Sequence, residues 1–209
     1  MIRTAPEGRW FIVAALLVLG ILLVTKLWWW ALFWFPLTVW VIAFFRDPAR
    51  NGPRGDNLVI APADGKIVSL IQLVEPAFHQ AETTRVSIFM NVFDCHVNRY
   101  PVSGRIGYWH YNPGRFLNAA DEKASLENEQ SSVGVVTPHG KVLVRQIAGL
   151  IARRIVTDHR EGQDVKQGDR MGMIRFGSRV DVFLPPNARV LVKEGERTTA
   201  GMTVIAEWT

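Results

Sequence analysis

Gly177 and Ser178 form a glycine–serine pair in an apolar setting, with Phe176 before it and Val180 and Val182 after it. Most such pairs lie in ordinary turns or bulges. A reactive pair needs a backbone strained enough at the glycine to expose its carbonyl, and a base that helps the serine hydroxyl attack that carbonyl. The pair is therefore a candidate self-cleavage site, and the alternative is an ordinary turn with no chemical role.

His96 is the best candidate for that base among the five histidines. It follows the apolar run 86–93, which is typical of a strand, and β proteins often present reactive side chains where a strand ends. A lone histidine is more often a surface or capping residue. Asp64, in the turn Pro62-Ala63-Asp64-Gly65, is a second candidate, although turn formation by Asp-Gly would explain it without any chemistry.

The sequence lacks the spacings typical of metal and phosphate sites, such as His-x-x-x-His, Cys-x-x-Cys or a glycine-rich phosphate loop. We therefore expect no metal. Cys95, the single cysteine, adjoins His96, but neighbours on a strand point to opposite faces, so a Cys–His dyad is not expected. One cysteine also excludes an intrachain disulfide.

The net charge is +5, but the basic residues form no long run and no stripe with interleaved aromatics, so nucleic acid is not the expected partner. Several arginines instead flank the apolar N-terminal region. Positive charge at such a place fits the anionic, cytoplasmic face of a membrane. These flanking residues are Arg3, Arg9, Arg46, Arg50 and Arg54.

Residues 10–45 carry a single charge, Lys26, which divides two apolar runs, 10–25 and 27–45. A membrane-spanning helix needs about 20 apolar residues, so the second run is long enough and the first is marginal. Tryptophans at 28–30 mark the break, where an interfacial belt would place them. We favour a membrane anchor over 1–45 that forms a helical hairpin with both ends on the cytoplasmic side.

Four alternatives for this region stay open. The first is a single tilted span kinked at Pro36, and the second is a hairpin that dips into only one leaflet of the membrane. A signal peptide over the first run is a third reading, although no small-residue cleavage site follows it. A buried helix pair of a soluble protein is the fourth.

A linker rich in proline, glycine and charge spans 46–57, and the rest of the chain, 58–209, reads as one mostly β domain. Helical signal is thin and confined to 119–130 and 149–155. We expect a barrel-sandwich-like fold with long loops and little helix. The runs predicted as strands are 58–60, 66–73, 85–91, 105–109, 132–137, 141–147, 171–174, 180–183, 189–192 and 203–205.

The segment 162–174 resembles the strand-turn-strand of biotinyl/lipoyl-like barrel-sandwich domains, and 62–68 and 192–198 look like further turns of that type. A carrier domain would present a lysine on an exposed hairpin tip. Met171-Gly172-Met173 offers none, so the pattern indicates the fold more than a carrier role.

The motifs and their order resemble the phosphatidylserine decarboxylase family in its short-chain form. The resemblance runs from about Phe45 to the end of the chain, after an N-terminal anchor that the family also has. It rests on Phe45-Arg46-Asp47-Pro48, Ala61-Pro62-Ala63-Asp64-Gly65, the segment 94–104 that begins Asp94-Cys95-His96-Val97-Asn98-Arg99, the loop 113–129, and Arg175-Phe176-Gly177-Ser178.

The resemblance implies that the chain is a proenzyme that cuts itself between Gly177 and Ser178. The products are a β chain, 1–177, and an α chain, 178–209, whose N-terminus becomes a pyruvoyl cofactor formed from the serine. Ser178, His96 and Asp64 would act as a triad in this cleavage. The mature α–β heterodimer, alone or as a further dimer, would decarboxylate phosphatidylserine to phosphatidylethanolamine, with His96 returning a proton to the carbanion.

A lipid substrate explains the anchor and implies an inner-membrane enzyme with its catalytic domain on the cytoplasmic face. The resemblance places the loop 113–130 near the substrate. Phe116 and Leu117 would dip into lipid, and Arg115 or Lys123 would meet the phosphate.

The chain departs from the family pattern in three places. Arg99 stands where longer relatives have a second histidine, Arg179 stands where a Thr or Ser usually follows the serine, and Gln130 replaces a frequent arginine. Two alternatives remain open. The first is an archaetidylserine decarboxylase, whose substrate has ether-linked lipid tails, and the second is a non-catalytic, membrane-anchored barrel-sandwich adaptor.

Overall fold

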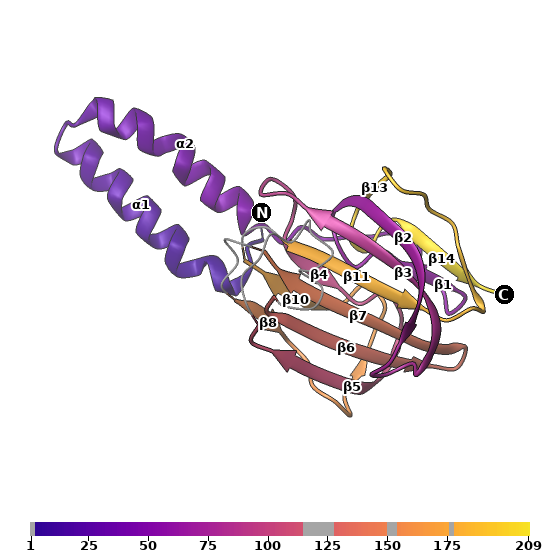
Figure 1. Ribbon diagram of the computed structural model, residues 1–209. Coiled ribbons are helices and arrows are strands. Elements are labelled where there is room, and N and C mark those ends of the chain that lie inside the picture. Colours follow the sequence, from indigo (N-terminus) through magenta and orange to yellow (C-terminus); the bar gives the residue numbers. More distant parts are fainter. Residues whose placement is uncertain (1–2, 115–127, 150–153, 176–177) are drawn as a thin grey trace. The chain divides into compact units, whose positions relative to one another are not determined.

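The structure, a computed structural model, describes residues 3–114, 128–149, 154–175 and 178–209, and only the backbone of residue 178. The chain divides into two compact units, Met1–Ala49 and Arg50–Thr209. The first holds two helices and the second holds the strands (Figure 1).

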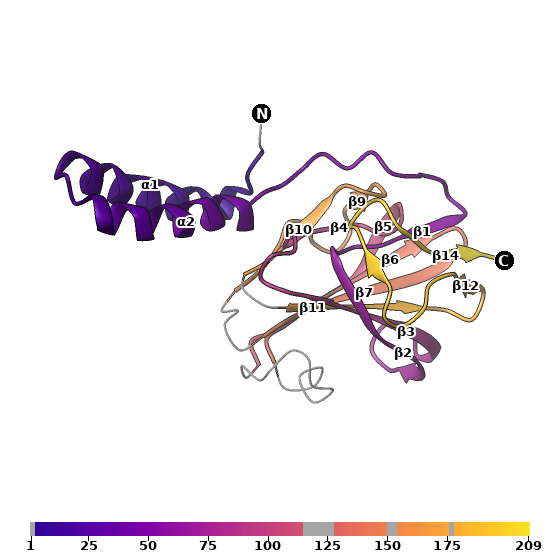
Figure 2. The same ribbon diagram turned by 90° about the horizontal axis from the view of Figure 1, so that it is seen from above.

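The first unit is a hairpin of two antiparallel helices, α1 (Arg9–Val24) and α2 (Trp28–Phe44), preceded by the 3-10 turn η1 (Pro6–Gly8) (Figure 2). Trp34 Nε1 donates a hydrogen bond to the Ala15 carbonyl of the facing helix at 2.9 Å. The base of the hairpin is closed by the Ala5 N–H, which donates to the Phe45 carbonyl at 2.7 Å. The two apolar runs therefore form the predicted hairpin, and α2 continues through Pro36.

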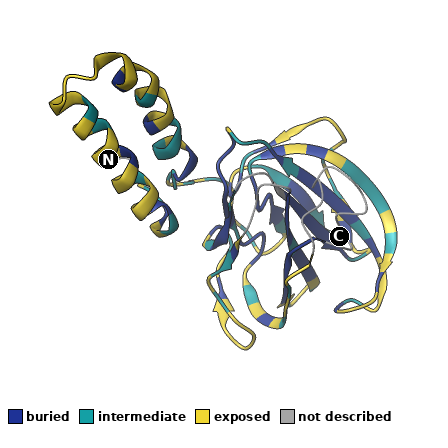
Figure 3. Cartoon of the chain, turned by 60° about the vertical axis from the view of Figure 1, so that its left-hand side comes forward, coloured by how far each residue is buried: buried dark blue, intermediate teal, exposed yellow. Residues whose placement is uncertain are grey.

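Most residues of both helices are exposed (Figure 3), and many of these are large and apolar. Trp10, Trp29 and Phe33 are 83%, 78% and 77% exposed, and few side chains of the hairpin are buried. Within its own unit the hairpin is therefore unlike the buried helix pair of a soluble protein. Residues 6–24 are long and apolar enough to cross a membrane, whereas α2 is a shorter apolar helix. The expectation that the second run is the longer span is therefore wrong, because the first helical segment begins at Pro6 and α2 ends at Phe44.

The second unit is built on a curled, half-barrel sheet with the strand order β13-β2-β3-β11-β7-β6-β5-β9 (Figure 1). All its strand pairs are antiparallel. Its strands are β2 (Gly65–Glu75), β3 (Ala81–Met90), β5 (Gly104–Asn112), β6 (Gln130–Thr137), β7 (Gly140–Ala148), β9 (Asp164–Val165), β11 (Ser178–Leu184) and β13 (Arg197–Thr198).

Two smaller sheets complete this unit. One has the order β1-β14-β12, with β1 (Leu58–Ile60), β12 (Ala188–Val190) and β14 (Val204–Trp208). The other has the order β4-β10-β8, with β4 (Val97–Arg99), β8 (Ile155–Thr157) and β10 (Arg170–Ile174).

The main core lies on one face of the large sheet. Alternate residues of neighbouring strands, such as Ile88, Val144 and Val180, are fully buried there, as the two-residue period of a strand requires. Ile205 of β14 and Met171 of β10 join the same cluster. All three sheets therefore share one core, and the mostly β prediction is confirmed.

Every run that the sequence predicts as a strand overlaps an observed strand. The predictions missed β4, β8, β9 and β13, which are two or three residues long and too short to show periodicity. The predicted helical segments lie mostly outside the described residues. Where they are described they are wrong, because Gln130 begins β6 and Ile155 begins β8.

The predicted strand-turn-strand over 162–174 is present as β9, a turn and β10, but its two strands enter different sheets. Gly168 in this turn has φ 87°, a left-handed conformation that glycine adopts without strain. The segment therefore links the large sheet to the β4-β10-β8 sheet.

Glu75 ties the turn after β2 to the sheet. Its buried carboxylate accepts the N–H groups of Ala77, Phe78 and His79 at 2.8–3.1 Å and lies 3.4 Å from Arg145 Nη2. Burial raises the pKa of Glu75, but the three hydrogen bonds and the arginine outweigh burial, so its pKa lies below the ordinary value.

We expect Glu75→Ala to lower the free energy of unfolding by about 3 kcal/mol at pH 7, because it leaves Arg145 and three amides without their acceptor. A carboxyl whose pKa is depressed on folding stabilises the protein above its unfolded pKa, and that stability is lost as the pH falls through the folded pKa. Urea unfolding of the full chain in detergent should therefore show the difference between variant and wild type shrinking as the pH falls through and below the ordinary range of a glutamate pKa.

The matched control is Glu82→Ala, on the exposed side of the same hairpin, which should change stability by less than about 0.5 kcal/mol. Equal losses in the two variants would contradict the role given to Glu75.

Candidate active site

Ser178 lies at one end of the large sheet, between the ends of two strands. Its backbone pairs with Met90, the last residue of β3, and with Ala148, the last residue of β7. Gly177 and Phe176 lie outside the described residues. The serine of the candidate cleavage site is therefore the first residue of a central strand that is held from both sides.

The turn after β3 carries His96 to the same end of the sheet. Asp94 shapes this turn, because its Oδ2 accepts the Asn91 N–H at 2.9 Å and its Oδ1 pairs with Arg197 of β13. The His96 carbonyl accepts the N–H of Ile174 at 3.4 Å, and Ile174 ends β10 just before the cleavage segment. A backbone contact thus places His96 beside the segment that leads into residues 176–177.

The His96 side chain is fully buried, and its Nδ1 lies 3.0 Å from the Asp94 carbonyl oxygen. A carbonyl oxygen only accepts hydrogen bonds, so Nδ1 must carry the proton. In the neutral ring, Nε2 is then the nitrogen with the free electron pair. The geometry therefore assigns any base function of His96 to Nε2.

Asp64 lies in a turn that packs against this corner. The Pro62 carbonyl accepts the N–H of Arg99 in β4 at 2.9 Å. A Cβ on Gly65 would collide with the Phe89 carbonyl of β3, so the chain can approach that strand only with a glycine here. The turn is therefore fixed against the two strands that flank the His96 turn.

The Asp64 carboxylate contacts two groups. Its Oδ2 accepts from Arg50 Nη2 at 2.7 Å, and its Oδ1 accepts the Ala200 N–H at 2.8 Å. The structure thus brings the turn of Asp64, the turn of His96 and the backbone of Ser178 to one corner. A direct action of Asp64 on His96 stays a prediction.

A buried chain of polar side chains lies behind this corner, and sequence analysis missed it. Asn98 Oδ1 accepts from Gln146 Nε2 at 2.8 Å, and Gln146 Oε1 accepts from Thr157 Oγ1 at 3.3 Å. Thr157 is in turn hydrogen-bonded to Ser131 at 2.7 Å, and Asn98 Nδ2 contacts the Met90 sulfur at 3.7 Å. The chain cross-links the strands around the residue that pairs with Ser178.

Asn128 and Glu129 fasten the end of β7 from the other side. Asn128 Nδ2 donates to the Ala148 carbonyl at 2.7 Å, and the Ala148 N–H donates to the Glu129 carbonyl at 3.0 Å. Glu129 Oε1 also accepts from Tyr111 and from the Ile155 backbone. Both strands that pair with Ser178 are therefore held in place by buried hydrogen bonds.

The residues predicted to meet the substrate, Arg115, Phe116 and Lys123, lie outside the described residues, as does Leu117. Within the part of the chain that the structure describes, no group of His, Cys, Asp or Glu side chains is arranged to hold a metal ion.

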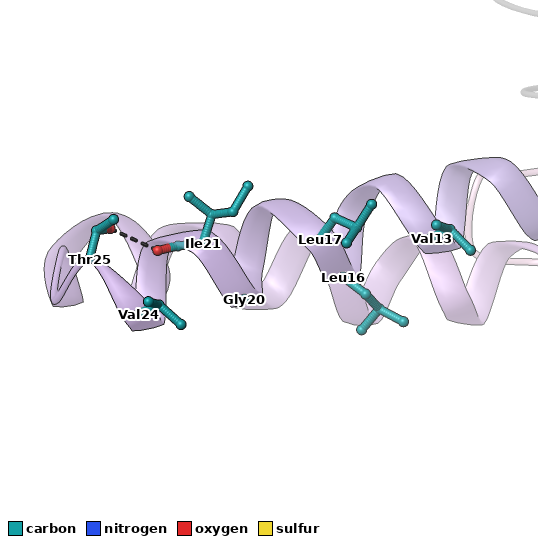
Figure 4. Close-up of a pocket in the computed structure, with 7 residues that line it drawn as sticks. All are labelled: Val13, Leu16, Leu17, Gly20, Ile21, Val24 and Thr25. Carbon is teal, nitrogen blue, oxygen red and sulfur yellow. Dashed lines mark hydrogen bonds between the residues drawn. The ribbon is translucent and has the colours of Figure 1, made fainter.

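The helical hairpin also carries a pocket, which lies along α1 and is lined by apolar side chains such as Leu16, Leu17 and Ile21 (Figure 4). The Thr25 hydroxyl, at one end of it, donates to the Ile21 carbonyl at 2.8 Å. With no ionisable group among its lining residues, this pocket has no means of acid–base chemistry.

Comparison with known proteins shows the family of the chain. The sequence pattern of the phosphatidylserine decarboxylase family matches residues 37–206, which include Asp64, His96 and Ser178. A protein of Nitrobacter winogradskyi described as a phosphatidylserine decarboxylase proenzyme is 53% identical over 176 residues, which cover 82% of this chain and 71% of that protein. The chain belongs to the phosphatidylserine decarboxylase family.

Proposed function

We propose that this protein is a phosphatidylserine decarboxylase, which releases the carboxyl group of the serine headgroup as CO2 and leaves phosphatidylethanolamine. The family match over residues 37–206, together with a 53% identical relative, carries this conclusion. The corner around Ser178 supports it, because a serine backbone and a buried histidine converge there. A non-catalytic adaptor is disfavoured by the family membership.

Maturation is proposed to begin when the Ser178 hydroxyl attacks the Gly177 carbonyl, with His96 Nε2 accepting the hydroxyl proton. The acyl group moves from the serine nitrogen to its oxygen, and elimination then releases residues 1–177 with a carboxylate end. One water molecule hydrolyses the remaining dehydroalanine, releases ammonia and leaves a pyruvoyl group on residue 178. Asp64 is proposed to support the charged form of His96 through its negative charge, because the Asp94 carbonyl already accepts from Nδ1.

Residue 178 is well placed to hold such a group. Its backbone is paired to Met90 and Ala148, and buried hydrogen bonds hold both strand ends. The pyruvoyl group supplies an electron-accepting carbonyl when the substrate amine is bound to it. His96 Nε2, in its protonated form, is proposed to return a proton to the carbon that has lost CO2.

The two chains formed by cleavage would stay together as a heterodimer. Strands that follow the cleavage site pair with strands that precede it: β11 with β3 and β7, β13 with β2, and β14 with β1. Separating the chains would expose the shared core, so we expect them to separate only on unfolding.

The hairpin is proposed to anchor the enzyme in the inner membrane with the catalytic unit on the cytoplasmic face. Its apolar side chains are exposed, and arginines flank it at both ends. Anionic lipids on the cytoplasmic leaflet attract such residues. A membrane-bound substrate requires an enzyme at that surface.

The loop 113–130 is proposed to meet the lipid headgroup. A charged hydrogen bond to phosphate contributes about 1.5–3 kcal/mol, so Arg115→Glu should raise KM for phosphatidylserine vesicles roughly tenfold or more and leave self-cleavage intact. Arg105→Glu is the control, because it makes the same charge change at an exposed position of β5. An unchanged KM in the Arg115→Glu variant would show that Arg115 does not bind the lipid headgroup.

The activity is tested with vesicles of phosphatidylserine labelled in the serine carboxyl group. The proposal expects labelled CO2 and unlabelled phosphatidylethanolamine, both suppressed by a carbonyl reagent. Release of CO2 that is insensitive to carbonyl reagents would contradict a pyruvoyl enzyme. A parallel assay with the ether-linked lipid distinguishes a phosphatidylserine from an archaetidylserine enzyme.

A further inference from the structure

Arg50, the first residue of the globular unit, binds Asp64 directly. Its Nη2 lies 2.7 Å from Asp64 Oδ2, and the two side chains are only 17% and 14% exposed. An ion pair shielded to this degree is weakened less by water and salt than a surface pair. Sequence analysis interpreted Arg50 only as one of the cations that flank the membrane anchor, so this contact calls for a separate explanation.

The contact fixes the carboxylate in one orientation. The second oxygen, Oδ1, accepts the N–H of Ala200 at 2.8 Å, so each oxygen of Asp64 is held by a different segment. Free rotation about the last side-chain bond is thereby prevented. A carboxylate that must act on a neighbouring group gains from such pre-organisation, because misplacement by about 1 Å can cost a hundredfold in rate.

The backbone that carries Arg50 is itself fastened. Arg54 donates to the Arg50 carbonyl at 3.0 Å and to the Gly201 carbonyl at 2.7 Å. Gly201 follows Ala200, whose N–H holds the other oxygen of Asp64. The segment 50–54 and the turn 199–203 therefore form one cross-linked support around this carboxylate.

We propose that Arg50 is a positioning residue for self-cleavage, which holds the Asp64 carboxylate in the orientation from which it supports His96. This inference rests on the proposed roles of Asp64 and His96. It gives the junction between the anchor and the catalytic unit a part in maturation. Arg50 takes no proton and touches no reacting atom, so its whole effect passes through Asp64.

The test follows self-cleavage of the full chain, made by cell-free translation with a pulse of labelled amino acid in the presence of vesicles. We expect Arg50→Gln to lengthen the half-time of the precursor ten- to a hundredfold. Arg50→Lys should recover much of that loss, because it restores a cation beside Asp64. Arg189→Gln is the matched control, since it removes an arginine from the ion pair with Glu207 in another part of the unit and should cut at the wild-type rate.

A double-mutant cycle separates positioning from a general loss of stability. If Arg50 acts through Asp64, Arg50→Gln should cause no further slowing in an Asp64→Asn chain. Equal slowing in both backgrounds would overturn the inference, as would cleavage of Arg50→Gln at the wild-type rate. If the Asp64→Asn chain is cleaved too slowly for its rate to be measured, the comparison of Arg50→Lys with Arg50→Gln decides. Cleavage of Arg50→Lys as slow as that of Arg50→Gln would then overturn the inference.

The outcomes also separate this inference from the proposed function. A wild-type chain that is never cleaved would contradict the proposed maturation itself. Rapid cleavage of Asp64→Asn would remove Asp64 from the mechanism, and Arg50 with it. Normal wild-type cleavage with an unaffected Arg50→Gln would reject the positioning role alone. Thermal unfolding of the Ser178→Ala chain with and without Arg50→Gln shows how much of any slowing comes from misfolding.

Discussion

The Ser178→Ala chain is expected to remain a single polypeptide of 209 residues and to release no CO2 from phosphatidylserine. Alanine lacks the hydroxyl that would attack the Gly177 carbonyl, so no bond is broken and no pyruvoyl group forms. The substitution removes one atom and leaves the backbone of residue 178 free to pair with Met90 and Ala148. The loss of activity should therefore be complete, whereas the fold should be retained.

Gel analysis of the purified chain and a CO2-release assay measure the two parts of this prediction. Ser69→Ala, on β2, is the control and should be cut and active like the wild type. Cleavage of the Ser178→Ala chain between residues 177 and 178 would show that the serine is not the nucleophile. An uncut but active chain would show that the cofactor does not come from residue 178.

His96→Asn is expected to slow self-cleavage by about 10²- to 10⁴-fold, the range typical of losing a general base. The asparagine amide can donate to the Asp94 carbonyl in place of Nδ1–H, which lies 3.0 Å from it in the wild type. Asparagine has no basic nitrogen to replace Nε2. The variant thus removes the base and keeps the hydrogen bond that orders the turn.

A pulse-labelled precursor followed over hours gives the cleavage rate of this variant. His139→Asn is the control, because His139 stacks on Trp208 and its backbone carbonyl accepts from Asn187, away from the His96 turn. Cleavage of His96→Asn at the wild-type rate would exclude His96 as the base and leave Ser178 in need of another activator.

The strands of this fold were largely readable from the sequence, but their partners were not. Residues 141–147 and 180–183 are rich in Val, Leu, Ile and Phe, as strands often are, and both lie on strands. Nothing in that pattern says that β11 lies between β3 and β7, because these pairs join residues far apart in the chain. Short strands such as β4 have too few residues for any period to show.

Sequence motifs also identified the main residues of the candidate site but not the contacts between them. The order of the motifs singled out Asp64, His96 and Ser178, and the structure gathers their segments at one corner. The Asp94 carbonyl that sets the His96 tautomer is a backbone atom, which no sequence motif reveals. Gln146 follows Arg145 in a strand with no motif to mark either residue, and its link to Asn98 exists only after folding.

Arg50 shows how one residue can satisfy two patterns. Its position after an apolar run is typical of a charge at the membrane surface, and composition alone supports no other role. Its guanidinium instead lies 2.7 Å from Asp64 and is largely shielded from water. A charge count near a membrane segment therefore cannot separate lipid contacts from structural ion pairs.

The most direct test of self-cleavage is the intact mass of the purified wild-type protein under denaturing conditions. Self-cleavage predicts two chains, residues 1–177 and a 32-residue chain, 178–209. The smaller chain should be lighter by one ammonia than the same chain beginning with serine, and should react with carbonyl reagents. A single species with the mass of all 209 residues would contradict self-cleavage and the cofactor that depends on it.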